Sequence, residues 1–203
     1  MYFNRRVGIA MIAAGLVAGS APATLITFDN LASNTLVTNQ YPGVTFSSDP
    51  GEGMYTAGGT PVSYPNFLCT APIGSEIDCI NNVYIDFATP VSGLSIWAVE
   101  PNQYGTVATF YLYNGATLLG TQNLIGLAAV PASFGYGNLF IDLSAFSNVT
   151  RLEIRGPGGS GFIDNSYGGN GIGWDDLSFT EPAPGAAGVL GLGGFVVMTR
   201  RRR

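Results

Sequence analysis

Carboxylates are the main groups in this sequence that could carry acid–base chemistry, because its 203 residues include no histidine and no lysine. Imidazole-based triads, zinc sites with histidine ligands and lysine Schiff bases are therefore excluded. Two carboxyl groups can still hydrolyse a glycosidic bond, and the available ones include Glu76, Asp78, Glu100 and Glu153. Glu153 lies two residues from both Arg151 and Arg155, which indicates a charge ladder on one strand face. Glycoside hydrolysis is the less favoured alternative, and we expect no enzyme.

Three aspartates are the candidates for a metal site. Asp29 directly follows the first predicted strand, and Asp175 and Asp176 lie in the last one. This pattern resembles carbohydrate-binding jelly-roll modules, and the resemblance implies a structural calcium held by these three residues, since calcium accepts carboxylate and carbonyl oxygens. Two alternatives stay open. Asp175 shares the parity of Leu177 and, if buried, could pair with backbone N–H groups or an arginine, or the aspartates could be exposed turn-capping groups.

Tyrosines are the candidates for sugar contacts, because an exposed ring can stack on the apolar face of a sugar. Tyr111 and Tyr113 point together from a predicted strand whose Phe110 and Leu112 point the other way. The candidate glycan-binding residues are Tyr104, Tyr111, Tyr113 and Tyr167. The alternative is that these rings fill a core or cover a sheet face.

The elements that position these residues are predicted to be strands. Short apolar runs of period two, separated by Gly, Pro and Asn, indicate an all-β antiparallel domain from Thr24 to Thr180. Asn114-Gly115 predicts a hairpin with a type I′ turn. We expect a two-sheet sandwich of jelly-roll type. The predicted strands are 25–28, 44–47, 83–87, 94–99, 106–113, 117–124, 139–143, 149–155 and 174–180.

Cys69 and Cys79 are the only cysteines. A metal site built on two cysteines would lack histidine partners, and a nucleophilic cysteine would lack a base. We expect a disulfide, which would also fit an oxidising compartment outside the cytosol.

Residues 1–23 have the organisation of a secretory signal peptide. Arg5 and Arg6 precede an apolar run, and Ala21-Pro22-Ala23 provides small residues at a cleavage site. We expect a signal helix that signal peptidase removes, leaving Thr24 as the first residue of the mature protein.

Residues 181–203 combine Glu181-Pro182, an uncharged apolar run from Gly185 to Met198, and Arg200, Arg201, Arg202 and Arg203. This order resembles the PEP-CTERM sorting signal of exported bacterial proteins, although the first proline of the Pro-Glu-Pro element is replaced by Thr180. The resemblance implies a hydrophobic helix that anchors the chain in the inner membrane until an exosortase cleaves near Glu181. The four arginines would hold the C-terminus on the cytoplasmic side.

The charge distribution excludes one class of partner. Residues 24 to 180 hold two arginines against twelve acidic residues, a net charge of −10. Such a surface repels phosphate backbones, so we expect no nucleic-acid binding. The resemblance to exported proteins implies a location outside the cytosol, and we expect a noncatalytic protein of the cell surface or extracellular matrix, associated with exopolysaccharide. The alternative is a carbohydrate-binding module with a structural calcium; no other cofactor is expected.

Overall fold

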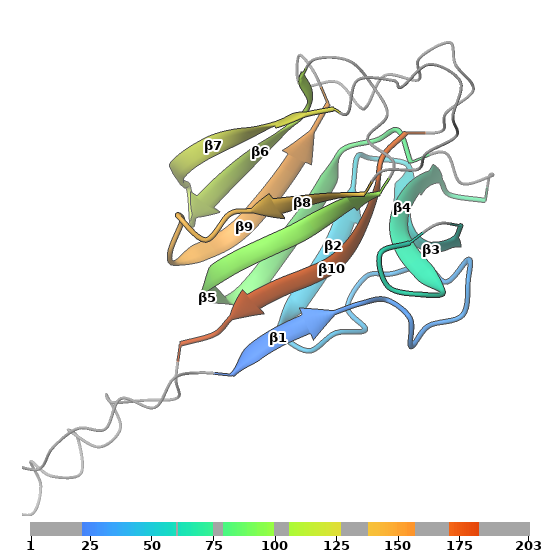
Figure 1. Ribbon diagram of the computed structural model, residues 1–203, viewed down its shortest axis with the longest axis horizontal. Coiled ribbons are helices and arrows are strands. Elements are labelled where there is room, and N and C mark those ends of the chain that lie inside the picture. The colour runs from blue at the N-terminus through green and yellow to red at the C-terminus, as the bar shows by residue number, and fades with distance from the viewer. Residues whose placement is uncertain are drawn as a thin grey trace, which may run out of the picture. The chain divides into compact units, whose positions relative to one another are not determined.

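The computed structural model describes residues 22–59, 61–74, 79–99, 106–126, 138–156 and 171–182. These residues form ten strands, all in antiparallel pairs, and no helix (Figure 1). The all-β antiparallel class is thereby confirmed. The strands are β1 (Ala23–Ile26), β2 (Val44–Ser48), β3 (Glu52–Gly58), β4 (Asn66–Pro72), β5 (Val83–Val99), β6 (Thr106–Asn114), β7 (Thr117–Ile125), β8 (Leu139–Asp142), β9 (Val149–Arg155) and β10 (Gly173–Thr180).

Strand β5 joins two groups of strands. Its first half pairs with β2 and β9, and β6 and β7 follow beyond β9. Its second half pairs with β8 and β10, and β1, β4 and β3 follow beyond β10. The two predicted strands 83–87 and 94–99 are therefore the two halves of one 17-residue strand.

The strand changes groups at residues 88–90, which are exposed. Pro90 has no N–H to donate to a ladder, so pairing is interrupted there. Gly93 then adopts φ +62°, and a Cβ at this position would lie 3.3 Å from Oγ1 of Thr180. The bend in β5 therefore depends on a proline and a glycine that alternation alone does not reveal.

The core lies between the two groups. Phe110 of β6 packs edge-on against Trp174 of β10, with ring centroids 5.7 Å apart, and Phe87 of β5 packs in the same way against Phe179 at 5.2 Å. Since successive side chains of a strand point to opposite faces, residues that alternate with these lie on outer faces. The jelly-roll sandwich itself stays a prediction.

Two features of the strand prediction are wrong. Strands β3 and β4 were not predicted, and the β6–β7 turn is centred one residue later than expected. Asn114 pairs with Thr117, which leaves Gly115 and Ala116 as the turn, and of these only Gly115 has positive φ, +56°. A single positive φ at the first central residue is typical of a type II′ turn rather than type I′.

The predicted disulfide is confirmed. Cys69 of β4 is bonded to Cys79, with Cα atoms 4.7 Å apart, and both residues are buried. Ala57 and Phe67 pack with them in a small cluster beside the main core. The N–H of Ile172 donates to the carbonyl of Cys79 at 3.0 Å, so the disulfide region is tied to the residues that precede β10.

The two ends of the chain fall almost entirely outside the described residues. Residues 1–21 of the predicted signal peptide and Arg200, Arg201, Arg202 and Arg203 lie outside the described residues, whereas Glu181 and Pro182 are described and exposed. Within the described ranges there is no helix that could cross a membrane.

Candidate functional site: an arginine–tyrosine face

Strand β9 places three charged side chains on one face. Arg151, Glu153 and Arg155 alternate with Leu152 and Ile154, which are fully buried in the core. Positions two apart on a strand point to the same side, so the charged residues lie on the outer face of the first group. The spacing Arg-x-Glu-x-Arg is thus what puts a charged row there.

The neighbouring strands set tyrosines beside this row. Glu153 lies directly opposite Tyr84 of β5 and Tyr111 of β6, and Arg151 lies opposite Asp86 and Tyr113. Paired residues on adjacent strands have their side chains in contact range. We call this surface the arginine–tyrosine face, and its members are Tyr84, Asp86, Tyr111, Tyr113, Arg151, Glu153 and Arg155.

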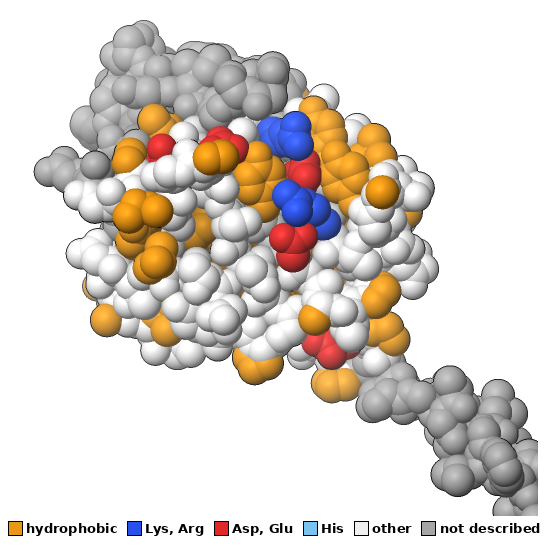
Figure 2. Space-filling view, turned by 180° about the vertical axis from the view of Figure 1, so that it is seen from behind, with side chains coloured by type: hydrophobic (Ala, Val, Ile, Leu, Met, Phe, Trp, Pro, Cys, Tyr) orange, Lys and Arg blue, Asp and Glu red, His pale blue; other side chains and the backbone are white. Residues whose placement is uncertain are grey.

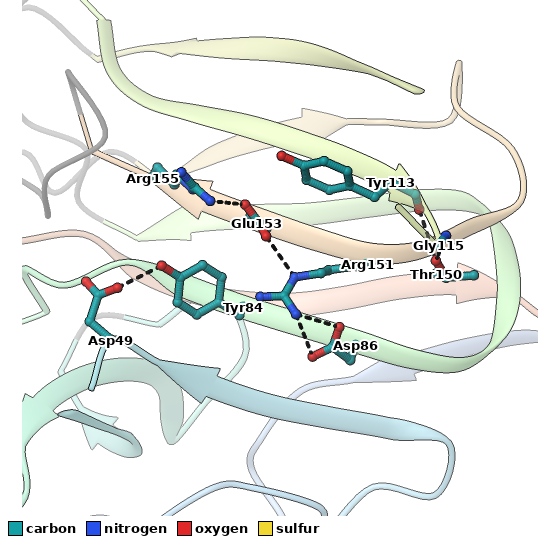
Figure 3. A network of polar contacts seen from close by, with 9 residues as sticks. All are labelled: Asp49, Tyr84, Asp86, Tyr113, Gly115, Thr150, Arg151, Glu153 and Arg155. Atoms are coloured by element: carbon teal, nitrogen blue, oxygen red, sulfur yellow. Dashed lines mark hydrogen bonds and ion pairs between the residues drawn. The ribbon is translucent and has the colours of Figure 1, made fainter. Parts of the chain in front are cut away.

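A continuous ladder of ion pairs crosses the face (Figure 3). Nε of Arg151 donates to Oε1 of Glu153 at 2.8 Å, and Nη2 of Arg155 donates to Oε2 of the same carboxylate. Nη1 of Arg151 also donates to Oδ1 of Asp86 at 3.3 Å. The predicted charge ladder is therefore present. Both oxygens of Glu153 are engaged, so this carboxylate holds two guanidinium groups in place.

Burial differs sharply along the ladder. The Glu153 side chain is 9% exposed, whereas those of Arg151 and Arg155 are 38% and 36% exposed. Burial opposes the charge of Arg155, but the hydrogen bond and the negative charge of Glu153 raise its pKa above the ordinary value. Because one buried carboxylate holds two partly exposed arginines, the ladder fixes the positions of the side chains on this face.

Two tyrosine rings are in contact with the arginines. The guanidinium carbon of Arg151 lies 5.1 Å from the ring centroid of Tyr84, and that of Arg155 lies 5.4 Å from the centroid of Tyr111. These distances are typical of cation–π contacts. The Tyr84 hydroxyl also donates to Oδ1 of Asp49 at 2.7 Å. Burial, followed by this hydrogen bond and the charge of Asp49, raises the Tyr84 pKa, so its phenol stays protonated.

Several polar atoms of the arginine–tyrosine face are available to hydrogen-bond to a ligand. The hydroxyls of Tyr111 and Tyr113 have no hydrogen-bond partner among the described residues, and neither guanidinium group uses all five of its N–H donors. Figure 2 shows this side of the molecule, with the two arginines in blue, acidic side chains in red between and below them, and hydrophobic or aromatic side chains in orange on both sides. The arginine–tyrosine face is therefore accessible at the surface of the molecule.

The predicted tyrosines have different outcomes. Tyr111 and Tyr113 are on the face, where both are half-buried, whereas Tyr104 and Tyr167 lie outside the described residues. Tyr84 was not singled out from the sequence. Its alternation with Val83 and Ile85 placed it on an outer face, but nothing in the sequence showed that β9 would lie beside it.

The predicted calcium ligands lie around another part of the fold, the 61–66 segment. Oδ2 of Asp175 accepts hydrogen bonds from the N–H groups of Val62 and Ser63 at 2.9 and 3.0 Å, and its Oδ1 accepts from the N–H of Asp176 at 2.8 Å. Oδ1 of Asp29 accepts from the N–H of Asn66 at 3.0 Å. Of the alternatives left open by the sequence, the structure shows backbone pairing for Asp175.

The first and last strands do lie side by side, since β1 pairs with β10. The donors that face Asp29 and Asp175 are backbone N–H groups and the Ser63 hydroxyl, however, and the described residues contain no group of three acidic, cysteine or histidine side chains that could hold a metal ion. Oδ1 of Asp176 is buried without a hydrogen-bond partner in the described part of the chain. The calcium site stays a prediction, and no step below depends on it.

The orientation expected for Asp175 is wrong. A bulge between Asp175 and Ser178 shifts the register of β10, so Trp174 and Leu177, three residues apart, both face the core. Asp175 lies opposite Trp97 and points to the other side of the sheet, where the 61–66 segment covers it. It is fully buried, and burial raises its pKa to about 7.

A second aromatic pair was missed. Trp97 of β5 and Phe140 of β8 are directly paired on the outer face of the second group, with ring centroids 5.2 Å apart, and Phe140 is 49% exposed. Both residues alternate with buried aliphatic residues, so their parity was a usable signal. The sequence did not show that Trp97 and Phe140 pair with each other, because this pairing depends on which strand lies beside β5.

Comparison with known proteins gives weak likenesses only. No known family model and no curated protein matches the sequence. Among solved structures, the K2 cleaved adhesin domain of Lys-gingipain is similar with a TM-score of 0.47 and 12% identity, over 78% of this chain and 97% of that chain.

Two further structures are similar at lower scores. A carbohydrate-binding module of family 29 gives a TM-score of 0.35 with 14% identity, over 77% of this chain and 88% of that chain. The K3 cleaved adhesin domain of Lys-gingipain from Porphyromonas gingivalis W83 gives 0.36 with 16% identity, over 79% and 93%. Such likenesses are too weak to transfer a function, so this chain's own residues must supply it.

Proposed function

We propose that this protein is a noncatalytic surface protein that binds carbohydrate through the arginine–tyrosine face. The observation that carries the proposal is the row of Tyr84, Tyr111 and Tyr113 beside two arginines on an open sheet face. Sugars present hydroxyl groups around apolar C–H faces. Sugar hydroxyls can hydrogen-bond to the hydroxyls of Tyr111 and Tyr113 and to the remaining guanidinium N–H groups. The tyrosine rings can contact the apolar C–H faces of the sugar.

The geometry favours binding over catalysis. A glycosidase needs one carboxyl group that stays protonated and a second that is free to attack or to activate water. On this face, Glu153 has both oxygens hydrogen-bonded to arginines, and Asp86 is paired with Arg151. Neither carboxylate is free for those roles. Glu76, Asp78 and Glu100 lie outside the described residues.

The setting that we propose for this binding is the cell surface or the extracellular matrix. The Cys69–Cys79 disulfide supports an oxidising compartment, because such bonds are rare in the cytosol. The signal peptide and the PEP-CTERM-like tail support export through an inner-membrane intermediate and release by an exosortase. Association with exopolysaccharide would then bring the face into contact with its ligand.

Affinity electrophoresis through gels that contain soluble polysaccharides tests the binding proposal. We expect retardation by at least one polysaccharide, weakened about tenfold by Tyr111→Ala combined with Tyr113→Ala, which corresponds to about 1.4 kcal/mol. Phe140→Ala is the matched control, because it removes an exposed ring from the other outer face. If retardation is lost in Phe140→Ala but kept in the tyrosine double variant, the binding site is the Trp97–Phe140 pair and not the arginine–tyrosine face. No retardation by any polysaccharide would refute the proposal.

A further inference from the structure

The charges of the arginine–tyrosine face are balanced. Arg151 and Arg155 are matched by Asp86 and Glu153, and the three ion pairs connect all four side chains. No other arginine and no lysine occurs between residues 24 and 180, where the net charge is −10. A ligand that approaches the face therefore meets neutralised guanidinium groups within an acidic surface.

Glu153 is the central residue of this balance. It is the one ladder residue that contacts both arginines, and it is the most buried of the four, with 9% of its side chain exposed. Its single negative charge is therefore shared by two guanidinium groups, both of which stay partly exposed to solvent. Asp86 contacts Arg151 only and is 42% exposed.

We propose that Glu153 makes the arginine–tyrosine face selective for uncharged glycans. The inference rests on the proposed carbohydrate binding and adds the class of ligand. Hydroxyl groups can accept from the spare N–H donors and donate to Asp86 without adding charge to the site. A uronate or sulfate group would have to approach two carboxylates, and the arginines that could offset this repulsion are already paired.

The test compares neutral and acidic polysaccharides with one set of variants. The neutral probes are laminarin, dextran and xyloglucan, and the acidic probes are alginate and polygalacturonate, each in low and in high salt. For the wild type we expect tight binding to a neutral probe and weak but measurable binding to the acidic ones. Glu153→Gln keeps the side-chain shape but leaves both arginines without their shared counter-charge. We expect it to gain at least fivefold in alginate affinity, and high salt should abolish the gain.

Asp142→Asn is the matched control for net charge. Asp142 is exposed on β8, in the other group of strands, so the same loss of one charge should leave alginate binding unchanged. Asp86→Asn provides a second variant on the face, with a smaller expected gain, in case Glu153→Gln does not fold. Folding of each variant is checked by its thermal transition.

The outcomes separate the two proposals. A wild-type protein that binds alginate more tightly than every neutral probe would overturn the selectivity and leave carbohydrate binding intact. Equal alginate affinity in folded Glu153→Gln and the wild type would also overturn the role of Glu153. A protein that binds no probe of either kind would refute carbohydrate binding itself.

Discussion

Asp175 has an ionisable side chain in a fully buried environment. It is a carboxylate with no exposed surface, and its hydrogen bonds come from backbone N–H groups and the Ser63 hydroxyl. The neighbouring carboxylate of Asp176 carries a charge of the same sign. Desolvation is the main cause that raises its pKa to about 7, and the charge of Asp176 adds to it, whereas the N–H groups of Ser63, Asp176 and Val62 act in the opposite direction.

This pKa predicts a stability that rises as the pH falls. The folded state holds the Asp175 proton with a pKa of about 7, compared with the ordinary value of 3.8, so protonation favours folding below pH 7. The chain has no histidine to titrate in the same window. We expect the free energy of unfolding to increase by up to about 2 kcal/mol between about pH 8 and pH 5.5.

Urea denaturation at several pH values checks this prediction. Asp175→Asn cannot titrate and should show a flat profile over the same range. Asp142→Asn is the control, because Asp142 is exposed on β8 and its pKa is lowered by hydrogen bonds to Ser144. It should keep the wild-type slope. An equal slope in the wild type and Asp175→Asn would show that Asp175 is not the titrating group.

At the scale of elements, the strands that the sequence predicts well are those with one buried face. Strands β6 and β9 alternate clearly, and the Arg-x-Glu-x-Arg spacing of β9 was enough to predict the charge ladder. Strand β4 was missed because Leu68, Cys69, Thr70 and Ala71 are all buried in succession, which removes the alternation. Strand β3 combines small residues and glycine with similar burial on both sides.

The candidate site needed information that no single strand contains. The sequence could place Tyr111 and Tyr113 on one face, and Arg151, Glu153 and Arg155 on another strand's outer face. Their meeting depends on β9 lying between β5 and β6, which is a matter of strand order. The prediction of the Asp175 orientation was wrong for a related reason. The bulge in β10 changes which face the following side chains point to, and no glycine or proline marks it in the sequence.

The β6–β7 turn gives a prediction about backbone geometry alone. Gly115 has φ +56°, and a Cβ added there would meet no atom within 4 Å. Any cost of Gly115→Ala must therefore come from the positive φ, and we expect about 1 kcal/mol of destabilisation, or a melting temperature lower by about 2–4 °C.

Gly58→Ala is the control for this turn. Gly58 lies in β3 without positive φ, and its added Cβ would make ordinary contacts at 3.7 and 3.9 Å. Thermal denaturation followed by circular dichroism should show little change or a slight stabilisation. A Gly115→Ala protein as stable as Gly58→Ala would show that the hairpin does not require the left-handed conformation.

At the scale of the whole molecule, the basic residues are divided between two places. Six of the eight arginines lie in the first six and last four residues, and the other two are on the arginine–tyrosine face. The arginines at the ends belong to the predicted signal peptide and the predicted sorting signal. Removal of both ends would leave an acidic domain whose only basic groups are those of the proposed binding site.

Processing of both ends is therefore the prediction that concerns the complete chain. In a bacterium with an exosortase, we expect intact-mass spectrometry to find a secreted form that begins at Thr24, ends near Glu181 and contains the Cys69–Cys79 disulfide. We expect the four charges of Arg200 to Arg203 to hold the C-terminus on the cytoplasmic side, so replacing these residues by alanine should abolish C-terminal cleavage. Signal-peptide removal should be unaffected, because residues 1–23 are unchanged, and it serves as the internal control. A secreted wild-type protein that retains Arg200 to Arg203 would show that the tail is not a sorting signal, even if the domain binds glycans.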